Sequence, residues 1–301
     1  GVSGPRRKLL AEWIANADNP LTARVMVNRI WQYHFGKGLV ATSSDFGKNG
    51  SHTEHQKLLD WLAVEFIESG WSIKHLQRTI LRSHVYRQSM NHSDRVACEK
   101  VDPQNELLWV RDAIRLEAEV IRDSVLAVSG RLNRVMGGPP FFPDVDDELM
   151  QRAPTWWEPS PRVARERRTI YMLQIRSLQM PFIKVFDGPN IDESCPVREV
   201  TTVTPQVFAL FNSRLLREQS EAMAERLASE VGKDRALQIR RAFQLAFQRL
   251  PAEAELIRCQ EFLEDPEKST SATSEAEVNP HGTLADLCLV LLNSNEFIFL
   301  D

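Results

Sequence analysis

The chain has 301 residues, of which 43% are apolar, and its formal net charge is -4. A chain of this size can bury one large core or two smaller ones, and its small, evenly mixed charge provides no protein-wide field that would attract nucleic acid or lipid headgroups. Its apolar runs are far shorter than the roughly 20 residues of a membrane-spanning helix, so we expect no membrane span and no nucleic-acid partner.

The first ten residues, GVSGPRRKLL, lack the basic segment and the apolar run of a signal peptide. The sequence opens directly on a helix-start signal. We therefore expect it to be a fragment of a longer chain.

Helices with one apolar face each are expected through the first 130 residues. Pro20 at a helix start, the Thr53/Gln56 spacing of a capping box and the N-cap residue Ser72 mark where helices begin. Glycines mark where they end. The expected helices run from Pro20 to Gly36, from Thr53 to Gly70, from Ser72 to Leu81, and from Leu116 to Gly130.

This helical periodicity disappears between residues 136 and 161. Six prolines fall between residues 139 and 161, and each fixes φ and removes a backbone donor, so the stretch cannot form a regular helix. Residues 169–175, TIYMLQI, have the β-branched and aromatic composition of a short strand.

Helices are expected again in the last hundred residues. Thr204 and Pro205 have the arrangement of an N-cap and a first helical residue, Asp234 is a second N-cap, and Pro251 opens another helix. Residues 265–282 are polar and predict a flexible loop before a final apolar helix. The sequence thus predicts a mainly α fold, with an N-terminal lobe (1–138), a Pro-rich irregular connector (139–168), a C-terminal lobe (169–301) and at most a short strand pair.

The loop from His34 to His55 is the first candidate site, because it is longer than the usual helix-to-helix connection of about 2–8 residues. It places His34, Asp45 and His55 among several glycines. Imidazole and carboxylate groups can act in acid-base chemistry or bind a metal, but no metal-ligand spacing is present and we expect no metal site. The structural alternative is that His34 ends its helix and Asp45 closes a turn.

The stretch from Cys195 to Gln206 is the second candidate site. A helix N-terminus beside an arginine and hydroxyl groups can bind an anion or activate a cysteine. The favoured alternative is that these groups satisfy the backbone of the connector where it enters the core. The candidate ligand-binding residues are Arg198, Thr201, Thr202 and Gln206.

Two charged stretches and the cysteines do not indicate further binding sites. RVARERR, residues 162–168, carries four arginines and one glutamate and is interpreted as a solvated connector rather than a phosphate-binding patch. FFPDVDDEL is interpreted as a solvated acidic loop rather than a calcium site, because an EF-hand's glycine and distal glutamate are missing. The four cysteines have neither CxxC nor CxxCH spacing, so we expect no cysteine zinc site, no covalent haem and no other cofactor.

Several motifs, in order, resemble the planctomycete-type, cytochrome-associated domain of unknown function, family 1553. They are NPLTARVMVNRIWQYHFGKGLVATSSDFG, LLDWLAVEFIESGWSIKHLQRTILRSHVYRQS, RLEAEVIRDSVLAVSGRL, SCPVREVTTVTPQVFALFNS and LADLCLVLLNSNEF. His34 to Gly36 match the family's His-Phe-Gly, and His55 matches its histidine before Leu-Leu-Asp-Trp. The usual proline after that histidine is Gln56 here.

The resemblance implies context more than mechanism. Similar domains usually end exported bacterial proteins that carry a cytochrome-c-like domain and a second helical domain upstream, and they are commonly encoded beside sulfatase-like proteins. It implies an extracytoplasmic location and a non-catalytic binding or assembly module that contacts those upstream domains. The resemblance also implies a glycan or a sulfatase-like protein as a further partner, with a role in polysaccharide utilisation. The alternatives are a hydrolase of carbohydrate or sulfated substrates that uses His34, Asp45 and His55, and a component of an electron-transfer complex.

Overall fold

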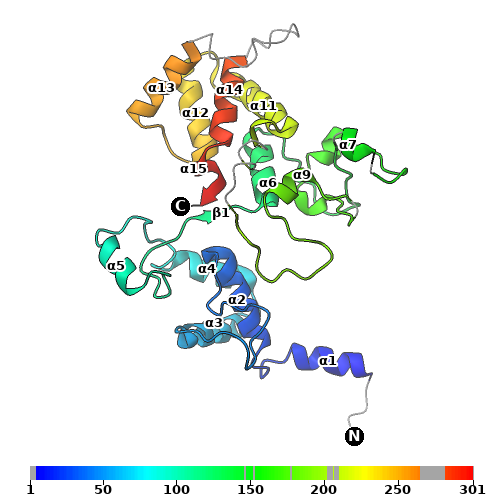
Figure 1. The fold of residues 1–301 in the computed structure, drawn as a ribbon, viewed down its shortest axis with the longest axis vertical. Helices are drawn as coiled ribbons and strands as arrows, with labels where there is room; N and C mark the ends of the chain where they lie inside the picture. Colours follow the sequence, from blue (N-terminus) through cyan, green and yellow to red (C-terminus); the bar gives the residue numbers. More distant parts are fainter. Residues whose placement is uncertain are drawn as a thin grey trace. The chain divides into compact units, whose positions relative to one another are not determined.

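The structure, a computed structural model, describes residues 5–145, 147–151, 153–176, 178–201, 206, 210–264 and 282–300. The chain divides after Ile114 into two compact units, and its elements are labelled in Figure 1. We call the part up to Ile114 unit 1 and Arg115–Leu300 unit 2.

Unit 1 is helical. Its elements are α1 (Arg6–Ile14), α2 (Thr22–Phe35), α3 (Gln56–Glu68), α4 (Ile73–Arg82) and α5 (Arg95–Val101).

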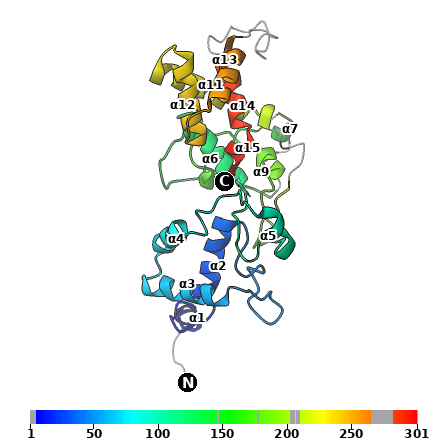
Figure 2. The same ribbon diagram turned by 90° about the vertical axis from the view of Figure 1, so that its left-hand side faces the viewer.

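The core of unit 1 lies among α2, α3 and α4, each of which packs on the other two. Figure 2 shows α3 crossing one end of α2. Gly36 ends α2 with φ 77°, which only glycine adopts without strain. Ser72 caps α4 as predicted, because its hydroxyl accepts the hydrogen bond of His75 N at 3.3 Å. The buried apolar side chains include Ala23, Val27, Ile30, Trp31, Leu59, Leu62, Phe66, Leu76 and Ile80.

The predicted capping box before α3 is wrong. α3 begins at Gln56 with His55 as its N-cap. Thr53 lies two residues before that cap, and its hydroxyl accepts a hydrogen bond from His55 N at 3.1 Å. It therefore shapes the turn into the helix rather than capping it.

Unit 2 is also mainly helical. Its elements are α6 (Ala118–Val128), α7 (Asp147–Met150), α8 (Arg162–Arg165), the 3-10 turn η1 (Thr169–Tyr171), α9 (Pro181–Val185), α11 (Arg214–Val231), α12 (Arg235–Phe247), α13 (Glu253–Glu264), α14 (Gly282–Leu292) and α15 (Asn295–Ile298). Two short strands, β1 (Ile114–Arg115) and β2 (Phe299–Leu300), pair as a two-stranded sheet.

The core of unit 2 forms where α11 packs on α6, α12 and α14. Asp234 caps α12 as predicted, since its carboxylate accepts the hydrogen bond of Leu237 N at 3.0 Å. The predicted helix start at Thr204-Pro205 and the polar loop up to residue 281 lie outside the described residues. The buried side chains include Ile121, Val125, Leu216, Met223, Leu227, Ile239, Phe243, Leu287, Cys288 and Leu291.

The mainly α fold class is confirmed, but two details differ. α6 buries Ile121 and Val125 in the core of unit 2, whereas the sequence grouped these residues with the N-terminal lobe. The strand expected at 169–175 does not form. Thr169 begins η1, and its backbone N–H donates to Asp123 Oδ1 at 2.7 Å, while Met172 and Ile175 make only isolated β-bridges. Within the described residues, no helix has the length and apolar character that would let it cross a membrane.

Candidate functional site

The loop after α2 is anchored to that helix by Asn28. The fully buried Asn28 amide donates to the Val40 carbonyl at 2.9 Å and accepts from Val40 N at 2.8 Å. A Cβ at Gly38 would lie 2.7 Å from Asn28 Nδ2, so this position needs glycine. The first part of the loop is therefore fixed in place, and it forms one wall of a cavity.

Residues 102–112 form a second wall around two polar side chains. The Asp102 carboxylate accepts hydrogen bonds from Glu106 N at 2.9 Å and Leu107 N at 2.7 Å, and Asn105 Nδ2 donates to the Val110 carbonyl at 2.7 Å. His55 Nε2 donates to the Glu106 carbonyl at 2.8 Å. This bond ties the second wall to the residues before α3.

The walls border a partly open cavity of about 190 Å³ in unit 1, roughly 13 to 19 times the space that one water molecule needs. Aromatic and aliphatic side chains of α2 and the two loops share its lining with charged and amide groups. Representative lining residues are Phe35, Lys37, His52, Glu54, Gln104 and Arg111.

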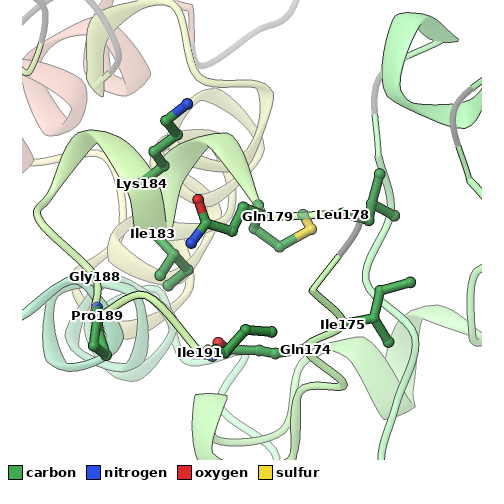
Figure 3. A pocket seen from close by; sticks show the side chains of 10 residues that line it. Gln174, Ile175, Leu178, Gln179, Ile183, Lys184, Gly188, Pro189 and Ile191 are labelled. Carbon is green, nitrogen blue, oxygen red and sulfur yellow. The ribbon is translucent and has the colours of Figure 1, made fainter. Parts of the chain in front are cut away.

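A smaller hollow lies in unit 2 among residues 174–191 (Figure 3). Its volume is about 10 Å³, enough for a single water molecule at most. The cavity of unit 1 is thus the larger of these two hollows.

The three candidate catalytic residues have different surroundings. His34 Nδ1 donates to the Ile30 carbonyl one turn earlier in α2, at 2.7 Å. Asp45 accepts the hydrogen bond of Gly47 N at 2.8 Å and so closes a turn. Among the three, His55 lines the cavity. The contacts of His34 and Asp45 are those of the structural alternative.

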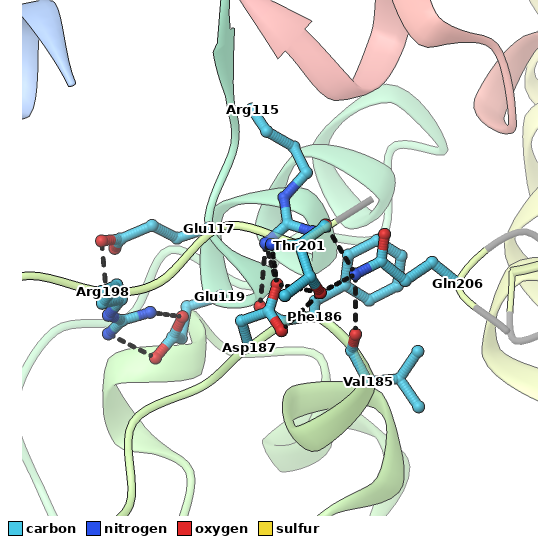
Figure 4. A network of polar contacts seen from close by, with 9 residues as sticks. All are labelled: Arg115, Glu117, Glu119, Val185, Phe186, Asp187, Arg198, Thr201 and Gln206. Carbon is cyan, nitrogen blue, oxygen red and sulfur yellow. Dashed lines mark hydrogen bonds and ion pairs between the residues drawn. The ribbon is translucent and has the colours of Figure 1, made fainter. Parts of the chain in front are cut away.

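The second candidate stretch is built around two arginines (Figure 4). Arg198 forms a bidentate pair with Glu119 on α6, at 2.7 and 3.0 Å, and its Nε lies 3.4 Å from Glu117 Oε1. Burial raises the pKa of Glu117. Burial is also the largest effect on Glu119, but the hydrogen bonds from Arg198, a backbone hydrogen bond and the charge of Arg198 together outweigh it, so the pKa of Glu119 lies below its ordinary value.

Asp187 organises the other half of this network. Its carboxylate pairs with Arg115 at 2.7 Å and accepts hydrogen bonds from Thr201 N at 2.9 Å and Thr201 Oγ1 at 2.8 Å. Gln206 Nε2 donates to the carbonyls of Val185 and Thr201, each at 3.0 Å. Burial favours the neutral acid of Asp187, but the bonds from Thr201 and Arg115 outweigh it, so its pKa is lowered.

These contacts support the structural interpretation of the second stretch. Arg198, Thr201 and Gln206 each bind protein groups in unit 2. Thr202 lies outside the described residues. Cys195 is exposed, and its thiol donates to the Val197 carbonyl at 3.2 Å.

The arginine-rich stretch 162–168 is not simply a solvated connector, and that prediction is wrong in part. Arg167 is buried, its guanidinium stacks 3.9 Å from the ring centre of Tyr171, and it donates to the Pro139 carbonyl at 2.9 Å. Arg165 pairs with Asp144 of the acidic stretch at 2.6 Å. The irregular backbone around the prolines leaves carbonyls that need donors, and arginine supplies them. Asp146 and the side chains of Asp147 and Glu148 lie outside the described residues.

Arg122 is a buried residue that the sequence interpretation missed. Its Nη1 donates to the Arg167 carbonyl and to Thr169 Oγ1, each at 3.1 Å. Burial lowers its pKa to about 10, against the attraction of Asp123. Its burial could have been predicted from its position: Arg122 lies three residues before the buried Val125 and four residues after Ala118, which places it on the apolar side of α6. Within the described residues, no group of three His, Cys, Asp or Glu side chains is placed to hold a metal ion.

Comparison with known families assigns the chain to a protein family. The family described as "Protein of unknown function (DUF1553)" matches residues 6–263, which is most of the sequence. The chain belongs to this family. The DUF1553 match includes α1 to α12, the cavity of unit 1 and both polar networks of unit 2, and it ends within α13. Searches among curated proteins and among solved structures found no match.

Proposed function

We propose that this DUF1553 chain is a non-catalytic binding and assembly module of an exported bacterial protein, and that it docks on a cytochrome-c-like domain of the same polypeptide. The polysaccharide context and the extracytoplasmic location come from the family resemblance. A helix in unit 1 with an uncovered apolar face supports the docking role.

That helix is α1, which has no buried residue. Leu10, Trp13 and Ile14 have the spacing that places side chains on one helical face, and they are 56%, 59% and 45% exposed. We call these three residues the α1 patch. Apolar side chains gathered on an exposed face are typical of protein-protein contacts, and tryptophan is often an energetic centre of such contacts.

The polar candidates support a non-catalytic role. Arg198, Thr201 and Gln206 hold the segment after α9 against α6 and α9. A hydrolase that uses His34, Asp45 and His55 would need their side chains to converge on one substrate. His34 instead bonds back to its own helix and Asp45 to its own turn.

Sedimentation velocity at the haem absorption band tests the docking role. The cytochrome-c-like domain, purified separately, is expected to sediment faster when this chain is added. Trp13→Ala should weaken the association at least tenfold, because a central tryptophan commonly contributes about 2 kcal/mol or more. Trp61→Ala is the matched control, since Trp61 is 52% exposed on α3 of the same unit. Equal loss in both variants, or no association of the unsubstituted chain, would contradict the proposal.

A further inference from the structure

The cavity of unit 1 has walls that are fixed before any ligand arrives. Asn28 anchors one wall, Asp102 and Asn105 brace the other, and His55 joins them, all through the hydrogen bonds described above. A ligand entering such a cavity has little ordering of the protein to offset. The backbone at Leu108, which lines the cavity, has φ 58°, a conformation that is rare for a residue of this size and is often found at binding sites.

Several polar groups on the lining have no partner within the described residues. The side chains of His52, Glu54 and Gln104 line the cavity and make no hydrogen bond or ion pair there. The Nε–H of Arg111 is buried without an acceptor, although its Nη1 donates to the Tyr86 carbonyl at 3.1 Å. That Nε–H is covered by protein atoms, so the exposed side chains of His52, Glu54 and Gln104 are the groups available to hydrogen-bond a ligand in the cavity.

The charges on the lining do not select an ion. The acids Glu54, Glu106 and Asp112 share the lining with the bases Lys37 and Arg111. Lys37 and Glu106 lie 3.6 Å apart. Because acidic and basic side chains are mixed on this lining, it favours neither an anion nor a cation. A neutral ligand with hydroxyl groups suits this lining better, because a hydroxyl both donates and accepts.

The size and the apolar surface of the cavity restrict the class of ligand further. Phe35, Val85 and Leu108 offer carbon surface beside the polar groups. The volume of about 190 Å³ is below the roughly 300–1,000 Å³ of sites for drug-sized ligands. The cavity therefore fits one small ring with an apolar face and polar edges rather than an extended molecule.

We propose that the cavity between residues 36–55 and 102–112 binds a neutral polyhydroxylated ring, such as a single sugar unit. The binding module proposed above would thereby have a ligand site. This inference rests on the proposed function in one respect, which is that the ligand is bound and left unchanged. His52, Glu54 and Gln104 hydrogen-bond the hydroxyl groups, and the carbon surface packs on the ring.

Saturation-transfer NMR on the full chain tests this site with D-glucose, D-galactose, D-xylose and L-fucose. Sodium acetate and methylammonium chloride serve as charged probes of similar or smaller size. At least one sugar should give a saturable signal, and the two charged probes should give none. No signal from any of the four sugars, or equal signals from acetate, would overturn the proposal.

Two variants locate the binding. Ala41 is exposed and lines the cavity, so Ala41→Trp should fill it, and Gln104→Ala should remove a rim amide. Each is expected to weaken sugar binding at least tenfold. Ala11→Trp on α1 and Gln77→Ala on α4 are matched controls at exposed positions of the same unit, and they should bind as the unsubstituted chain does.

Melting temperatures show whether each variant is folded. Loss of binding in Ala11→Trp or Gln77→Ala, or full binding in both Ala41→Trp and Gln104→Ala, would place the sugar elsewhere and overturn the site. Hydrolysis of the methyl glycoside or the 6-sulfate of a sugar that binds, followed by NMR over a long incubation, would contradict the non-catalytic function instead, while the location of the site would stand on the variants.

Discussion

Single buried polar residues hold the irregular parts of this chain. Asn28 satisfies the backbone of Val40, and Arg122 satisfies the backbone of the segment between α8 and η1. Buried backbone groups need partners wherever helices end. A substitution at such a residue removes the partner and leaves the backbone group unsatisfied, which costs about 1–3 kcal/mol for each group.

The reactivity of each cysteine is expected to depend on how deeply its thiol is buried. Cys288 is fully buried in the core of unit 2, and burial raises the pKa of its thiol; burial raises the pKa of Cys259 as well. Since the thiolate is the nucleophile, we expect iodoacetamide at pH 8 to modify the exposed Cys195 first and to leave Cys288 unmodified.

Peptide mapping by mass spectrometry measures this order. In denaturant all four cysteines should be modified at similar rates, which serves as the control. Modification of Cys288 in the native chain as fast as that of Cys195 would contradict the packing of α14.

At the residue scale, the sequence showed which groups were polar but not which were paired. Arg198 and Thr201 were recognised as belonging to a polar stretch, yet their partners lie outside it: Glu119 is 79 residues from Arg198, and Asp187 is 14 residues from Thr201. Hydrogen-bonding capacity is a property of one residue, whereas the partner depends on the tertiary fold. The anion-binding and structural interpretations could not be separated before the partners were seen.

At the scale of elements, a three-residue brace joins α12, α13 and α15. Arg249, just after α12, donates to Glu255 in the first turn of α13 through two bonds of 2.7 Å, and to Glu296 of α15 at 2.6 and 2.7 Å. The carboxylate of Glu255 also accepts from Ala252 N at 2.7 Å. Bidentate pairing of this kind fixes geometry more firmly than a single ion pair does.

The brace predicts a pH dependence of stability. The hydrogen bonds from Arg249, which outweigh the effect of burial, lower the pKa of Glu255 from 4.5 to about 2. As the pH falls, the unfolded chain takes up the proton first, so the stabilisation is complete above pH 4.5 and is lost between pH 4.5 and 2. Because the group is partly exposed and therefore screened, we expect Glu255→Gln to cost about 1 kcal/mol at pH 7.

Urea unfolding between pH 7 and 2 measures this effect. The difference in free energy of unfolding between the unsubstituted chain and Glu255→Gln should shrink toward zero as the pH falls through that window. Glu253→Gln is a matched control, because Glu253 is exposed in the same first turn of α13. A difference that does not change with pH would contradict the brace.

The helices were the most predictable elements, and the cavity walls were the least. Apolar periodicity and caps such as Ser72 and Asp234 are local signals, and they placed α4 and α12 correctly. The wall around Asp102 has no periodicity, and its shape follows from side chains that bond backbone groups four and five residues ahead. Sequence alone marked the loop after α2 as a candidate site but gave no sign of its opposite wall.

At the scale of the whole molecule, the chain contains two separate apolar cores. One gathers the side chains of α2, α3 and α4, and the other gathers those of α6, α11, α12 and α14. The proline-rich segment suggested where the two would be divided. α6 nevertheless belongs with the helices that follow that segment, because its apolar side packs on α11. The boundary between the two units therefore depends on which helix packs against α6, and the apolar periodicity of the sequence does not indicate this.

Two cores predict two unfolding transitions in the intact chain. Leu62 and Leu216 are fully buried, in unit 1 and unit 2 respectively, and replacing a buried leucine by alanine costs about 2–5 kcal/mol. In differential scanning calorimetry, Leu62→Ala should lower the temperature of one transition and Leu216→Ala that of the other. The double variant should show both shifts, each close to its value in the single variant, since substitutions in separate cores with no shared partners are additive. A single transition that both substitutions lower together would instead mean that the two cores unfold as one cooperative unit.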